Sequence, residues 1–113
     1  MKSKKYILTP PVSPGEVLRK HILDSRITQE SLSEAMNVSR FSVNQIVNGK
    51  RAVTPEMALR LAHVTSTTTD FWLNLQREVD LYLARKKIGA ELSKLPVIRR
   101  PKKSAELFKD AQA

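Results

Sequence analysis

Apolar residues recur along the chain at a spacing of three to four, in segments separated by short polar connectors. This period is typical of helices that bury one face. A serine or threonine stands before each segment, where its hydroxyl can accept an N–H that has no partner inside the helix. The pattern predicts an all-α fold with five helices, at residues 14–24, 29–36, 40–48, 55–64 and 70–86, with Ser13, Thr28, Ser39, Thr54 and Thr69 as N-caps.

The segment at 28–51 is the one around which the chain is organised. Each of its two helices has one apolar stripe, formed by Leu32, Ala35 and Met36 in the first and by Val43, Ile46 and Val47 in the second. Asn37 lies between them, and asparagine tolerates left-handed backbone, so it suits the end of the first helix. Two short helices joined by a tight turn indicate a helix-turn-helix, in which the second is the reader helix.

The outer face of the reader helix is rich in side chains that can read base edges. Arginine pairs with guanine, asparagine or glutamine pairs with adenine, and an aromatic ring contacts the methyl group of thymine. No acidic residue occurs between Glu34 and Glu56, where a surface that met only solvent would usually mix both signs. We therefore expect this helix to enter a major groove, with candidate DNA-binding residues Ser39, Arg40, Phe41, Ser42, Asn44, Gln45, Asn48, Lys50 and Arg51.

The alternative is a plain helical corner in a small all-α domain, with its polar residues on a solvated face. Helix-turn-helix spacing alone does not separate the two interpretations. The acid-free stretch and the face rich in arginine, asparagine and glutamine favour DNA binding.

The last helix is apolar over more of its circumference than one core needs. The stripe that we expect to close the core comprises Phe71, Trp72, Leu75, Val79 and Tyr82 or Leu83. Leu73 and Leu81 lie off that stripe on a common face, and a second apolar face predicts a partner. We expect a homodimer contact at Leu73, Leu81 and Ile88, whereas the alternative is a scattering of exposed leucines.

The formal net charge of +9 is distributed unevenly over the 113 residues. Residues 6–84 hold equal numbers of basic and acidic side chains, so the excess lies at the two ends. Basic tails on a neutral domain favour attraction to a polyanion such as DNA. We divide the chain into a flexible arm at 1–12, a helix-turn-helix domain at 13–86 and a basic, partly disordered extension at 87–113, where a short helix at 105–109 is possible.

Composition and motifs give little support to an enzyme. The chain has no cysteine, no apolar run of membrane-spanning length and no secretory signal, so we expect a soluble, cytoplasmic protein. His21 and His63 stand apart without metal-ligand spacing, and no HExxH, GxSxG or glycine-rich phosphate loop occurs. We expect no metal, no cofactor and no catalysis. An RNase built only from basic and polar groups would escape this search, but the helical pattern offers no β-rich platform for single strands.

With these residues in hand, the chain resembles a known family. TQESLSEAMNVS, followed by the reader helix and NGKR, resembles the lambda-repressor-like, or XRE-type, DNA-binding domain. PGEVLRKHIL, VNGKRAVTPEMALRLA and TDFWLNLQREVDL are similar to the HigA-type (VapI-like) antitoxins of bacterial toxin–antitoxin pairs. The resemblance spans about residues 13–85 and leaves the basic C-terminal tail outside it.

The resemblance implies a homodimeric repressor that binds a palindromic operator in its own operon and neutralises a HigB-type, RelE-like mRNA-cleaving toxin by direct contact. Its DNA contacts carry over as a phosphate contact and brace at Gln29, base-facing side chains at Arg40, Phe41, Asn44 and Gln45, and backbone contacts at Asn48 and Lys50. Phe41 departs from the small or polar residue often found there, which favours a thymine methyl or a shape contribution. Solitary members of the family exist, so a regulator with no toxin partner is the alternative.

Overall fold

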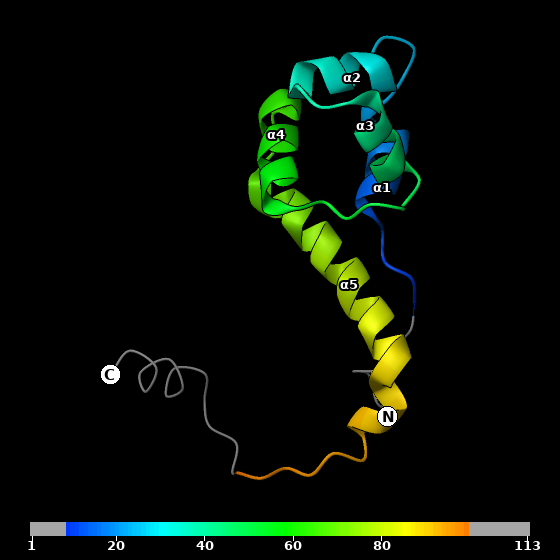
Figure 1. Cartoon of the computed structure of the whole chain (residues 1–113), viewed down its shortest axis with the longest axis vertical. Coiled ribbons are helices and arrows are strands. Elements are labelled where there is room, and N and C mark those ends of the chain that lie inside the picture. The colour runs from blue at the N-terminus through cyan, green and yellow to red at the C-terminus, as the bar shows by residue number, and fades with distance from the viewer. Residues whose placement is uncertain (1–8, 100–113) are drawn as a thin grey trace, which may run out of the picture.

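The computed structural model describes residues 9–99, and within them it confirms the all-α prediction (Figure 1). The first helix consists of α1 (Pro14–Val17) and a π-helical continuation, η2 (Leu18–Ile22). The remaining helices are α2 (Gln29–Met36), α3 (Arg40–Val47), α4 (Pro55–Thr65) and α5 (Thr69–Leu92). The described residues contain no strand.

A hydroxyl oxygen caps the start of each of α1 to α5. The capping residues are Ser13, Thr28, Ser39, Thr54 and Thr68, and each accepts the backbone N–H three positions on at 3.0–3.2 Å. Four of these caps confirm the sequence prediction. The prediction of Thr69 was wrong by one position, because Thr68 is the extended residue and Thr69 is already helical. Adjacent threonines carry the same local signal, so the packing of the helix decides which of them becomes the cap.

The first helix ends at Ile22, earlier than the predicted Asp24. Asp24 instead turns the chain toward α2, since its Oδ1 accepts the backbone N–H groups of Ile27 at 2.8 Å and Arg26 at 2.7 Å. These hydrogen bonds, the one from Ile27 first, hold the pKa of the Asp24 carboxyl below its ordinary value. A short polar side chain that bonds to the backbone just beyond it favours a turn over a further helical residue.

The last helix runs to Leu92, past the predicted end at Lys86, with Gly89 in its interior. The C-terminal extension that we began at residue 87 therefore starts inside a helix. Glycine in a helix costs about 1 kcal/mol relative to alanine. The neighbouring lysines and Ala90 are good helix formers, so one glycine does not end the helix.

The core lies between the first four helices and the start of α5. It comprises Val17, Leu18, Leu32, Met36, Val43, Ile46, Val47, Val53, Ala58, Leu61, Ala62 and Trp72. Trp72 is fully buried, and its Nε1 donates to Thr67 Oγ1 at 2.7 Å. Ala35, predicted on the inner stripe of α2, is exposed because Ser33 takes the inner position and donates its hydroxyl to the Glu30 carbonyl at 2.7 Å.

The apolar stripe predicted for α5 closes the core only at its start. Trp72 is buried and Leu75 packs against the core, but Phe71 and Leu83 expose 41% and 57% of their surface. Figure 1 shows why: α5 contacts the other helices near its beginning and then runs away from them. Positions further along the stripe therefore have no core within reach.

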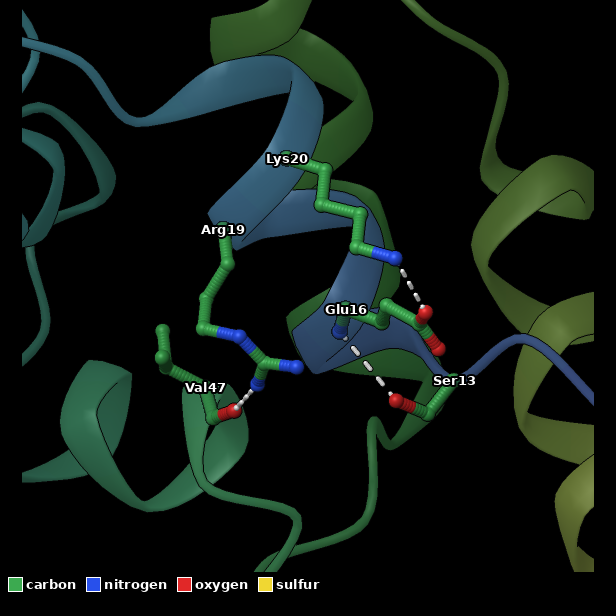
Figure 2. Close-up of polar contacts among 5 residues, drawn as sticks. All are labelled: Ser13, Glu16, Arg19, Lys20 and Val47. Atoms are coloured by element: carbon green, nitrogen blue, oxygen red, sulfur yellow. Dashed lines mark hydrogen bonds and ion pairs between the residues drawn. The ribbon is translucent and has the colours of Figure 1, made fainter.

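The first helix and α3 approach each other backbone to backbone at Gly15. A Cβ atom at this position would lie 2.4 Å from the carbonyl oxygen of Ile46 and 2.5 Å from that of Val47. One turn later, the Arg19 guanidinium donates to the Val47 carbonyl at 2.7 Å (Figure 2). The first helix thereby fixes the C-terminal end of α3.

The other side of the same helix carries an ion pair, also drawn in Figure 2. Lys20 Nζ lies 2.8 Å from Glu16 Oε2, and this hydrogen bond and charge hold the pKa of the Glu16 carboxyl below its ordinary value. Both side chains reach solvent, and such exposed pairs contribute little to stability. The Arg19 contact is therefore the one that links the helix to α3.

Two further side chains hold the helices around α3 in position. Arg60, on α4, donates to the Met36 carbonyl at the end of α2 at 2.8 Å. Gln76, on α5, accepts the backbone N–H of Val53 at 2.8 Å and so fixes the connector that follows α3. Helix ends leave carbonyl groups without an intrahelical partner, and the arginines bond two of them.

Residues 1–8 and 100–113 lie outside the described range. With them lie most of the predicted N-terminal arm, much of the basic C-terminal extension and the possible helix at 105–109. Among the helices that the structure describes, none is long and apolar enough to cross a membrane.

The close approach at Gly15 predicts a large difference between two glycine-to-alanine variants. Gly15→Ala should lower the free energy of unfolding by about 1–3 kcal/mol, because the new methyl group meets backbone that cannot move aside. Gly89→Ala is the matched control, since a Cβ there meets nothing within 4 Å. It should be neutral or raise stability by about 0.5–1 kcal/mol. Urea denaturation measures both, and equal effects would contradict the assigned contact.

Candidate nucleic-acid interface

The turn between α2 and α3 has a defined backbone geometry. Asn37 adopts left-handed backbone with φ 58°, as its sequence position predicted. Its N–H donates to the Glu34 carbonyl at 3.1 Å, and the Val38 N–H donates to the Ser33 carbonyl at 3.0 Å. These bonds close the end of α2 in the manner of a Schellman motif. The angle at which α3 leaves α2 is therefore set by the backbone.

α3 has one buried and one exposed face. Val43, Ile46 and Val47 are buried with at most 3% exposure, as predicted. Opposite them, at a spacing of four and three, lie Phe41, Gln45 and Asn48. Arg40, Phe41 and Asn48 are exposed, whereas Ser42, Asn44 and Gln45 are half-buried. The predicted candidates thus gather on the side of α3 that faces away from the core.

A chain of amide hydrogen bonds runs from α2 along α3. Asn44 Nδ2 donates to Gln29 Oε1 at 3.1 Å, and Asn48 Nδ2 donates to Asn44 Oδ1 at 3.2 Å. Gln29, at the first position of α2, is therefore brought together with two candidates on α3. The contact braces α3 against α2, as the resemblance implied for Gln29, and holds the Asn44 amide in one orientation.

A second group joins the start of α3 to the segment that follows it. Ser39 Oγ donates to Ser42 Oγ at 2.9 Å, and Arg51 donates to the same Ser42 oxygen at 2.8 Å. The Arg51 guanidinium carbon lies 5.8 Å from the centre of the Phe41 ring. The sequence placed Arg51 only near a passing phosphate strand and gave no sign of this contact, which joins residues ten positions apart.

The chain reverses after α3 at Gly49, which has φ 72°. The Lys50 N–H donates to the Gln45 carbonyl at 2.8 Å and closes this turn. Left-handed backbone favours glycine, so the turn has a direct sequence cause. Lys50 and Arg51 are exposed beyond it. Within residues 9–99, the side chains of Arg40, Gln45 and Lys50 make no hydrogen bond to another side chain.

The electrostatics of this surface follow from its composition. No carboxylate occurs between Glu34 and Glu56, while three cationic side chains and several amides point outward. Such a surface suits the edges of bases and the phosphates that flank them. In the part of the chain that the structure describes, no three His, Cys, Asp or Glu side chains gather at metal-binding spacing.

Sequence reasoning missed the residues that hold this surface in place. Arg19 and Arg60 bond to the carbonyl groups at the ends of α3 and α2, and Gly15 permits the close approach of the first helix. The sequence carries only a weak signal for them: Gly15 and Arg19 are spaced by four residues on one helical face. Tertiary packing decides what that face meets.

The three candidate dimer residues lie along α5. Leu73 and Leu81 line one shallow groove, together with Val53 and Ala84. Leu73 also packs partly against the core, and Ile88, with 38% exposure, lies further along the helix. The predicted residues are thus near one another on α5 and accessible.

Comparison with known proteins gives a consistent result. A family model described as "Helix-turn-helix" matches residues 18–72. The HTH-type transcriptional regulator YbaQ of Escherichia coli strain K12 is 47% identical over 81 residues, which are 69% of this chain and 70% of that protein. Antitoxin HigA-1 of Vibrio cholerae serotype O1 is 40% identical over 82 residues, which are 72% of this chain and 77% of that protein.

A solved structure agrees with these relatives. The antitoxin HigA of Pseudomonas aeruginosa, described with the higBA promoter, superposes with a TM-score of 0.73 at 34% sequence identity. The match covers 80% of this chain and 99% of that one. The chain therefore belongs to the HigA-type (VapI-like) family, whose members carry a helix-turn-helix DNA-binding domain of the XRE type.

Proposed function

We propose that this protein is a homodimeric transcriptional repressor that binds a palindromic operator in its own operon through α3. The observation that carries the proposal is the outward face of α3. It combines Arg, Asn and Gln side chains, lacks carboxylates and is braced by Gln29 on α2. The HigA structure described with the higBA promoter supports the same use of this fold. Such a protein acts in the cytoplasm, with the DNA.

The exposed side chains divide between two roles in this proposal. Arg40, Asn44 and Gln45 contact base edges and set the sequence, with Phe41 beside them. Ser39 and Ser42 lie at the N-terminal end of α3, which faces the groove floor in such complexes. The phosphate contacts come from Gln29, Asn48 and Lys50, with Arg51 on the same surface. Phosphate contacts supply much of the affinity, so binding should weaken steeply as salt rises.

Two alanine substitutions separate the two roles. Gln45→Ala should reduce discrimination by about 1–3 kcal/mol at one base pair, because a base contact is lost. Lys50→Ala should weaken binding to operator and to random duplexes alike, because a phosphate contact carries no sequence information. Fluorescence anisotropy with a set of single-substitution operators measures both.

The contrast between the variants is the decisive result. If Gln45→Ala lowered the affinity for operator and random DNA equally, Gln45 would not read a base. If the unmodified protein bound its upstream region no better than random DNA at low salt, the proposed function would fail.

We further propose that α5 forms the homodimer contact. Leu73, Leu81 and Ile88 offer an accessible apolar face beyond the part of α5 that closes the core. A two-fold dimer would set the two α3 helices about one duplex turn apart, roughly 34 Å, on a palindrome.

A charge placed on this face should separate the protomers. Ile88→Glu should be monomeric at concentrations where the unmodified protein is a dimer, because the carboxylate cannot be buried in an apolar contact. It should also lose its preference for a palindrome over a single half-site. Leu59→Glu is the control: Leu59 is 60% exposed on α4, away from the proposed face, and that variant should stay dimeric. Analytical ultracentrifugation reports the masses, and a dimeric Ile88→Glu would exclude this interface.

A second role follows from the family. We propose that the chain is an antitoxin that binds and blocks a RelE-like mRNA-cleaving toxin, as the name of the HigA-1 relative suggests. The alternative is a solitary regulator, and the YbaQ relative is named only as a transcriptional regulator. The two roles are compatible, since a repressor can also hold a partner on another surface.

Co-expression decides between the antitoxin and the solitary regulator. The experiment produces a small neighbouring reading frame with and without this chain. An antitoxin should co-purify with that product and restore growth, and Gln45→Ala should still do both because it acts on DNA alone. A toxic neighbour that neither associates with this chain nor is silenced by it would support the solitary regulator.

A further inference from the structure

Phe41 stands out on the proposed DNA-binding face. It lies on the outward stripe of α3 with Gln45 and Asn48, and its side chain is 63% exposed. The other outward side chains of α3 are polar, so this ring serves neither the core nor a hydrogen bond. An exposed aromatic ring that points toward a partner surface offers apolar contact area.

Arg51 lies against this ring. Its guanidinium carbon is 5.8 Å from the ring centre, within the range of a cation–π contact. Its Nη1 donates to Ser42 Oγ at 2.8 Å, and Ser42 in turn accepts the backbone N–H held at the start of α3 by Ser39. The Ser39 hydroxyl accepts the Ser42 N–H at 3.0 Å. The guanidinium is thus tied to the first turn of the helix.

The backbone explains how Arg51 reaches back to that turn. Gly49, with φ 72°, reverses the chain after α3, and the Lys50 N–H closes the turn on the Gln45 carbonyl. Arg51 then extends along the outside of α3 toward Phe41. Lys50 makes no side-chain contact with the described residues. The two neighbouring cations therefore have different surroundings, and only one of them is held on the helix.

We infer that Arg51 is a positioning residue: it holds the Phe41 ring in the orientation that contacts the 5-methyl group of a thymine in the major groove. This inference rests on the proposed DNA binding. It assigns to Arg51 a different task from that of a phosphate contact. Apolar contact with the thymine methyl is the readout open to a phenylalanine, because it has no donor or acceptor. A ring fixed by a cation on one face loses less freedom when it meets that methyl group.

Replacing thymine by uracil tests the methyl contact directly, because uracil lacks only the 5-methyl group. Each thymine of the operator is replaced in turn, symmetrically in both half-sites, and binding is measured by fluorescence anisotropy. At one position per half-site the unmodified protein should bind about fourfold less tightly, the factor expected when one methyl group is no longer removed from water. Phe41→Ala should bind the two duplexes equally.

The Arg51 variant separates positioning from phosphate binding. In Arg51→Ala, the ratio of thymine to uracil affinity at that position should fall from about four toward one. The slope of log affinity against log salt should change little. Lys50→Ala is the contrast, since it should keep the ratio and lower the slope by about 0.9 for one lost phosphate contact. Ser42→Ala removes the anchor while leaving the Arg51 charge, and it should lower the ratio part of the way.

The outcomes are distinguishable. An Arg51→Ala protein that keeps the fourfold ratio and loses about 0.9 in slope would overturn the inference and make Arg51 a phosphate contact. Tight operator binding with no uracil-sensitive position would also overturn it, and would leave the proposed repressor intact. Binding to the operator no tighter than to random DNA would remove both.

Discussion

The arrangement of the domain depends on the backbone contact between the first helix and the end of α3. Gly15 lets the two helices meet without a side chain between them, and Arg19 bonds to the carbonyl group that the end of α3 leaves unpaired. At the other end of α3, the turn at Asn37 fixes the entry angle. A helix of two turns has little stability of its own. Its position here comes from being held at both ends.

The two faces of α3 are therefore coupled. Its buried valine and isoleucine side chains complete the core, so the helix cannot rotate without breaking that core. Its outer side chains are held by hydrogen bonds among Gln29, Asn44 and Asn48. A surface arranged in advance loses less entropy when it binds a rigid partner. The core packing and the proposed recognition surface thus depend on the same helix orientation.

Much of this fold could be predicted from sequence because the signals are local. Apolar spacing located the helices, hydroxyl residues marked their starts, and Asn37 marked the turn. The exposed or half-buried positions of the candidates on α3 follow from the same periodicity. The failures involve information from outside the local segment. The burial of Phe71 depends on where α5 leaves the domain, and the choice between Thr68 and Thr69 depends on packing. The contact of Arg51 with Phe41 needs the path of the chain after Gly49.

The length of α5 has a mechanical consequence. A helix of this extent is a stiff rod of about 36 Å, fixed at its base by the burial of Trp72 and the bond from Val53 to Gln76. Tilting such a rod by about 5° displaces its far tip by about 3 Å. The rod acts as a lever, so a small change of angle where two copies meet at the tips is transmitted to the separation of their α3 helices. The tolerance of the pair for a given distance between half-sites is then governed by one hinge-free element.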